Sequence, residues 1–126
     1  MFILNPQSGI PIYRQVVDQV RRMVASGQLV SGSELPSVRE LAVQHAVNPM
    51  TISKAYALLE NEGLLIRQRG KPMQVAAISK EDSKQQKQDL LTPAIENLLL
   101  VAKQLDLDID ELLLLIKKHV KNKRES

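Results

Sequence analysis

The stretch that decides the fold is residues 48–65, NPMTISKAYALLENEGLL. Asparagine caps helices, proline suits the first helical position and glycine ends helices, so we expect a helix that starts at Pro49 and stops at Gly63. Apolar residues at helical spacing predict a buried stripe of Ile52, Ala55, Tyr56 and Leu59. The opposite stripe has small and polar side chains where a surface helix usually carries charge: Met50, Ser53, Lys54, Ala57 and Asn61.

Two further helices are predicted before this stretch. Residues 12–26 carry apolar side chains at helical spacing and are followed by Gly27, which indicates an amphipathic helix with a defined end. Residues 37–46 predict a short second helix, because Ser37 stands three residues before Glu40 in the pattern of a capping box. Only a tight turn is left between this second helix and the third.

A β-hairpin is predicted after the third helix. Residues 64–68 and 73–77 are short β-prone segments, and the Gly-Pro-containing turn 69–72 lies between them. Three helices, a tight turn between the second and third, and a terminal hairpin form the order of a winged helix-turn-helix. The fold class is therefore mainly α with a small β-hairpin, and we expect this domain to occupy residues 1–77.

The remaining segment, residues 78–126, is predicted to be helical. Residues 78–88 are polar and fit either a flexible linker or the solvated start of a helix; their Lys and Gln content favours a helix. Thr92-Pro93 fits either the start of a new helix or a kink in a longer one. A last helix is expected after Asp108, where Glu111 completes a capping box.

The apolar residues of this tail are too many for a two-helix hairpin to bury. Residues 112–116 read LLLLI and are apolar nearly all the way round a helix, which indicates burial on several sides. A second copy of the chain is the simplest partner, so we expect a two-fold homodimer. The residues expected at the dimer interface are Leu91, Ile95, Leu98, Leu99, Ala102, Leu105, Leu112, Leu113 and Ile116.

The charge distribution points to nucleic acid as the partner of residues 1–77. These residues hold 8 Lys and Arg against 5 Asp and Glu, whereas residues 78–126 hold 9 against 9. All of the net charge of +3 therefore lies in the helix-turn-helix part. In a helix-turn-helix motif the second of the two helices, here the third helix of the chain, enters the major groove of double-stranded DNA. The small and polar side chains on its outer face let the backbone approach base edges.

Three groups of residues are candidate DNA contacts. On the third helix, Asn48, Thr51, Ser53 and Lys54 are expected to donate to phosphates or bases, and Pro49 and Met50 to touch thymine methyl groups. Arg39, on the second helix, suits a bidentate contact to guanine. The hairpin turn, RQRGK, is expected to lie on a phosphate or in the minor groove through Arg67, Arg69, Gly70 and Lys71. The alternatives are an ordinary surface helix, a solvated arginine and a solvated turn.

Composition argues against several other functions. The chain has no Cys, 2 His, 2 Tyr, 1 Phe and no Trp, so we expect no disulfide, no metal site, no cofactor and no aromatic stacking of single strands. No nucleophile–base cluster or phosphate-binding glycine loop is present, so an enzyme is not expected. No apolar run has the length of a signal or membrane-spanning segment, and we expect a cytoplasmic protein.

Residues 11–77 resemble the GntR family of bacterial transcription regulators. The segments that carry the resemblance are PIYRQVVDQVRRMVASGQL, GSELPSVRELA, NPMTISKAYALLENEGLL and RQRGKPMQV, in that order. The short helical tail looks like that of the YtrA subfamily, by length and pattern. The resemblance implies a homodimer that binds an inverted repeat in promoter DNA, most often as a repressor of its own operon. In YtrA-like systems this operon often encodes an ABC transporter.

The resemblance also implies roles for individual residues. Arg39 matches the base-reading arginine of the family, residues 48–51 and Ser53 match contact positions on the recognition helix, and Arg69 and Gly70 match the wing tip. The chain departs from some members in having Pro49 and Ser53 where they have arginines. It also has GKPMQV in place of the wing pattern Gly-x-Gly followed by Thr-Phe-Val. The large effector domains of other family branches are absent, and the small tail leaves little room for an effector cavity; a pocket for a small-molecule effector at the dimer interface stays open as an alternative.

Two rival functions remain compatible with the sequence. The first is a winged-helix module that binds a protein through its third helix and never meets DNA. The basic hairpin turn and the excess charge of residues 1–77 speak against it. The second is a small-molecule enzyme with a pocket in the helical tail, which the absence of a catalytic cluster makes remote.

Overall fold

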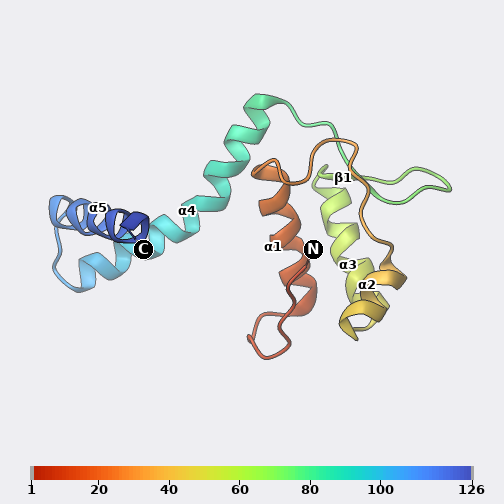
Figure 1. Cartoon of the computed structure of the whole chain (residues 1–126), viewed down its shortest axis with the longest axis horizontal. Coiled ribbons are helices and arrows are strands. Elements are labelled where there is room, and N and C mark those ends of the chain that lie inside the picture. The colour runs from red at the N-terminus through yellow and green to blue at the C-terminus, as the bar shows by residue number, and fades with distance from the viewer. Residues whose placement is uncertain (1, 126) are drawn as a thin grey trace. The chain divides into compact units, whose positions relative to one another are not determined.

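The computed structural model describes residues 2–125. The elements follow the chain in the order α1 (Ile12–Ala25), α2 (Val38–His45), α3 (Pro49–Asn61), β1 (Leu65–Ile66), β2 (Gln74–Val75), α4 (Lys80–Gln104) and α5 (Ile109–Glu125) (Figure 1). Contacts divide the chain into two compact units, Met1–Lys87 and Gln88–Ser126, and α4 runs across the division. The predicted mainly helical fold with a β-hairpin is confirmed.

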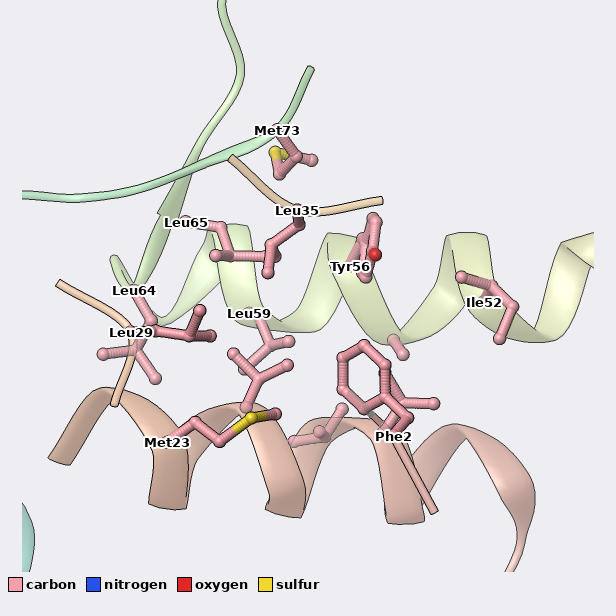
Figure 2. Close-up of a cluster of buried hydrophobic side chains, with 14 of the residues drawn as sticks. Phe2, Met23, Leu29, Leu35, Ile52, Tyr56, Leu59, Leu64, Leu65 and Met73 are labelled. Atoms are coloured by element: carbon pink, nitrogen blue, oxygen red, sulfur yellow. The ribbon is translucent and has the colours of Figure 1, made fainter. Parts of the chain in front are cut away.

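The core of the first unit lies between α1 and α3. The predicted stripe of α3 is buried, and Ile52, Ala55 and Leu59 have no exposed surface. Figure 2 shows Tyr56 and Leu59 of α3 on one side of this core and Met23 of α1 on the other, with Phe2 between the two helices. The apolar spacing that predicted these helices is therefore the spacing that packs them together.

The ends of α2 and α3 are set by the predicted capping residues. The Ser37 hydroxyl accepts the Glu40 backbone N–H at 3.0 Å, and the Asn48 side-chain oxygen accepts the Met50 N–H at 2.9 Å. The Tyr56 hydroxyl donates to the Pro36 carbonyl at 2.7 Å and so ties α3 to the segment before α2. Burial of this hydroxyl raises the pKa of Tyr56.

An ion pair joins the C-terminal ends of α1 and α3. The Arg21 guanidinium donates through Nε to Glu62 at 3.0 Å and forms a second bond to the other oxygen of that carboxylate. The hydrogen bond to Glu62 is the main reason why the pKa of Arg21 is raised. This pair helps to fix how α1 lies along α3, and the sequence pattern contained no sign of it.

The turn between α2 and α3 depends on an unusual backbone conformation. Ala46 follows the last residue of α2 and has φ 54 and ψ 45, in the left-handed region that glycine adopts at little cost. We predict that Ala46→Gly stabilises the protein by about 0.5–1 kcal/mol, because glycine relieves this strain and Ala46 is exposed. Urea unfolding measures the change.

The control for this prediction is Ala57→Gly, in the exposed middle of α3. There glycine only weakens the helix, by roughly 0.5–1 kcal/mol. Equal destabilisation by both substitutions would contradict a strained turn at Ala46.

The hairpin after α3 forms with shorter strands than predicted. Leu65 pairs with Val75 and Ile66 with Gln74, and the Ala76 N–H donates to the Leu64 carbonyl at 2.9 Å. The pairing stops there because Gly70 turns the chain with φ +73 and Pro72 has no N–H to donate. The turn extends away from the three helices in Figure 1. Met73 is nonetheless part of the core.

The start of the tail is a helix, as favoured from its composition. The Ser79 hydroxyl accepts the Asp82 N–H at 3.1 Å at the start of α4. The helix continues through Pro93, so Thr92-Pro93 does not begin a new helix. The Thr92 hydroxyl instead donates to the Gln88 carbonyl one turn earlier, at 2.7 Å.

The second unit is a hairpin of helices that buries little apolar surface. The predicted capping box is confirmed: the Asp108 carboxylate accepts the Glu111 N–H at 2.8 Å, and the Glu111 carboxylate accepts the Asp108 N–H at 3.3 Å. Within this unit the buried hydrophobic residues are Ala102 of α4 and Leu112 of α5. The other predicted interface residues are each at least 39% exposed: Leu91, Ile95, Leu98, Leu99, Leu105, Leu113 and Ile116.

Candidate nucleic-acid interface

The N-terminal end of α3 presents an open face of small and polar groups. Asn48, Pro49, Met50, Ser53 and Lys54 are exposed, and Thr51 is half-buried. Ile52 points into the core, so helical spacing places Met50 and Ser53 on the outer side of α3. The face contains no carboxylate and one cation, which suits close approach of a negatively charged groove.

Arg39 adds a cation from the first turn of α2. Its side chain is exposed and takes part in no hydrogen bond or ion pair within residues 2–125. Val43 follows one turn later on the same side of α2 and is 78% exposed, as is Met50 on α3. Val43 was not among the residues predicted from the sequence. The signal that could have identified it is the presence of a valine on the polar side of a helix whose other apolar residues face inward.

The predicted wing residues fall into two groups. Arg69 and Lys71 are exposed at the turn and have no ion-pair partner among residues 2–125. Arg67, although 63% exposed, lies 3.6 Å from the Glu60 carboxylate near the end of α3. The charge of Arg67 is therefore partly balanced within the protein, whereas the charges of Arg69 and Lys71 are available to a binding partner.

An open groove separates the wing from the start of α2. It has a volume of about 720 Å³ and is lined by residues 34–37, Glu40 and residues 67–72. Arg69 and Lys71 lie on one side of the groove, and Ser37, which caps α2, lies on the other. The cationic wing and the start of α2 thus border one open surface of the first unit.

Lys54 is the one predicted contact whose ammonium group lies on an aromatic ring. Its Nζ atom lies 4.0 Å from the centroid of the Tyr13 ring. Tyr13 belongs to the first turn of α1, is half-buried and packs against the core. The N-terminal ends of α1 and α3 therefore both reach this part of the surface.

Other kinds of site find no support within residues 2–125. No three His, Asp or Glu side chains there lie close enough to hold a metal ion. No helix in that range combines the length and apolar character needed to cross a membrane.

A short helix-turn-helix, a recognition helix with an open polar face and a cationic wing together define a winged-helix protein that binds double-stranded DNA. The sequence agrees, matching over residues 12–75 the family described as bacterial regulatory proteins, gntR family. The chain belongs to this family and is a DNA-binding transcription regulator, not an enzyme.

Similar proteins extend the likeness beyond the DNA-binding part. HTH-type transcriptional repressor YtrA of Bacillus subtilis (strain 168) is 32% identical over 112 residues, which cover 89% of this chain and 86% of the relative. A GntR family transcriptional regulator from Listeria monocytogenes has a similar structure, with TM-score 0.79 and 30% identity over 89% of this chain and 97% of that one. The likeness thus includes the helical tail.

A second similar structure contains DNA. The DNA-binding domain of AraR, solved in complex with operator ORX1, matches with TM-score 0.51 and 30% identity over 60% of this chain and 93% of that chain. This likeness covers part of the chain and is to a domain that binds operator DNA.

Proposed function

We propose that this protein represses transcription by binding an inverted repeat in operator DNA as a homodimer, with residues 1–77 on the DNA and residues 78–126 joining the two copies. The observation that carries the DNA part is the surface around α3. Arg39, Arg69 and Lys71 have no ionic partner within residues 2–125, and the exposed face at the start of α3 lacks carboxylates. Such cations are available to phosphates and guanines.

The proposed complex has two kinds of contact, one to base edges and one to the DNA backbone. Arg39 and residues 48–53 read base edges in the major groove, with Met50 against a thymine methyl group. Arg69, Gly70 and Lys71 hold the backbone or minor groove beside the recognition site. Arg67 makes the smaller contribution, because Glu60 lies beside it.

The dimer part of the proposal is supported by exposed apolar surface. Six of the seven exposed interface residues lie on α4 and α5, which bury little against each other, and Leu105 lies in the turn just after α4. Apolar patches of this kind mark protein interfaces. In two copies related by a two-fold axis, the patch of one copy packs against the same patch of the other. A two-fold dimer also explains an inverted repeat, since each copy reads one half-site.

Repression is proposed because relatives such as YtrA are named repressors. The resemblance to the YtrA subfamily further suggests that the operator precedes the protein's own operon, which encodes an ABC transporter. A hairpin of two helices encloses little space, so any small-molecule effector would bind between the two tails. Action on chromosomal DNA places the protein in the cytoplasm.

A salt titration tests whether the wing holds phosphates. We expect Lys71→Gln to reduce the slope of log affinity against log salt by about one per protomer, because one phosphate contact is lost. Lys103→Gln, an equal change of charge on the exposed surface of α4, serves as the control and should leave the slope unchanged. Fluorescence anisotropy on a labelled duplex measures both.

Binding that hardly varies with salt would favour the rival function, a winged-helix module that recognises protein. A slope reduced equally by Lys71→Gln and Lys103→Gln would show that only net charge matters and that the wing has no specific place on DNA.

A further inference from the structure

The contact between Tyr13 and Lys54 differs in kind from the ion pairs of this protein. The Lys54 ammonium lies over the face of the Tyr13 ring, with Nζ 4.0 Å from the centroid. Aromatic rings attract cations through the negative potential of their faces, and this distance is well within the range of that attraction. The two residues come from α1 and α3, so the contact depends on how these helices pack.

An aromatic ring holds a cation without cancelling its charge. Glu60 balances the charge of Arg67 at 3.6 Å, and Glu62 does the same for Arg21. Tyr13 is neutral, so Lys54 keeps its full charge while its position is restricted. The ammonium has three N–H donors, and those that point away from the ring stay free for an anion.

The placement of Lys54 explains why such restriction is useful. Lys54 lies one turn after Met50 and is the one cation of α3, at the edge of its exposed face. A lysine side chain has four rotatable bonds, and holding it in place on binding costs conformational entropy. A lysine already held over a ring loses less of that freedom when it meets a phosphate.

We propose that Tyr13 is a positioning residue for DNA binding: its ring holds the Lys54 ammonium where it binds a backbone phosphate beside the bases read by α3. The inference rests on the proposed function. It extends the DNA-binding surface to the start of α1, and it gives Lys54 a backbone phosphate as its partner. The role of Tyr13 lies in its ring and not in its hydroxyl.

Four variants of the full chain test this role: Tyr13→Phe, Tyr13→Leu, Lys54→Gln and the double variant Tyr13→Leu/Lys54→Gln. Affinity for an operator duplex is measured by fluorescence anisotropy at several salt concentrations. We expect Lys54→Gln to reduce the salt slope by about one per protomer. We expect Tyr13→Leu to weaken binding by roughly two- to fivefold per half-site, as fits an exposed cation–π contact, and Tyr13→Phe to bind like the natural protein.

The double variant decides whether Tyr13 acts through Lys54. If it does, Tyr13→Leu weakens binding no further once Lys54 is glutamine. Fully additive losses would overturn the inference. Equal losses for Tyr13→Phe and Tyr13→Leu would overturn it too, because they would assign the effect to the hydroxyl. An unchanged salt slope in Lys54→Gln would show that Lys54 binds no phosphate.

A second measurement covers the case in which Tyr13→Leu does not fold. The ε-methylene protons of Lys54 should shift upfield in NMR spectra of the natural protein and of Tyr13→Phe, since both rings lie beside them. An unshifted signal in both would contradict the contact. Failure of the inference is separable from failure of the proposed function, because Arg39→Ala still relaxes specificity at one base pair of each half-site when Lys54 is irrelevant to binding.

Discussion

Replacing Arg39 by alanine is expected to weaken binding to the operator by about 1–3 kcal/mol per half-site and to relax specificity at one base pair of that half-site. The structure gives the reason. Arg39 is exposed on the first turn of α2, and no group within residues 2–125 engages its guanidinium. A free guanidinium fork matches the two acceptors of guanine in the major groove.

The measurement compares the operator with a random duplex of the same length at one salt concentration. Loss on the operator alone supports base reading, whereas equal loss on both duplexes would show that Arg39 only contacts phosphates. Arg22→Ala is the matched control, because Arg22 is also exposed but lies in the last turn of α1. It should change neither affinity by more than the small effect of net charge.

Replacing Leu113 by aspartate is expected to convert the dimer to a monomer and to weaken operator binding by roughly 10²–10⁴-fold, since the two half-sites then bind independently. Leu113 is 45% exposed on α5, so a charge there need not disturb the hairpin of helices. In a dimer the same charge would be buried without a partner on both copies. Analytical ultracentrifugation gives the oligomeric state and anisotropy the affinity.

Leu114→Asp is the control for this experiment. Leu114 is 68% exposed and lies about 200° around α5 from the buried Leu112, outside the proposed interface. It should leave the dimer and its DNA binding intact. A Leu113→Asp protein that still sediments as a dimer would contradict the interface, and loss of the dimer in both variants would mean that α5 is covered on both sides.

Much of the fold could be predicted because its signals are local. Asn48 and Pro49 mark the start of α3, Ser37 and Asp108 cap α2 and α5, and each of these caps is formed in the structure. The apolar stripe of α3 also needs no partner to be recognised, since helical spacing reveals it. Such features depend on residues a few positions apart, which one sequence displays directly.

The remaining features depend on residues that only the packed structure brings together. Nothing in the sequence pairs Arg67 with Glu60 or places Lys54 over Tyr13. Both contacts change what a cation can offer to DNA, the first by balancing its charge and the second by positioning it. The residues of the candidate site could therefore be proposed from the sequence. Which cation has its charge balanced and which is held by an aromatic ring could not.

The measurement that tests the central claim most directly is selection of bound sequences from a pool of random duplexes, at two salt concentrations. The proposed homodimer predicts enrichment of an inverted repeat, with its two half-sites at fixed spacing and the repeat still preferred at the higher salt. No enriched sequence at either salt would contradict the claim that α2 and α3 read bases as a pair of half-sites.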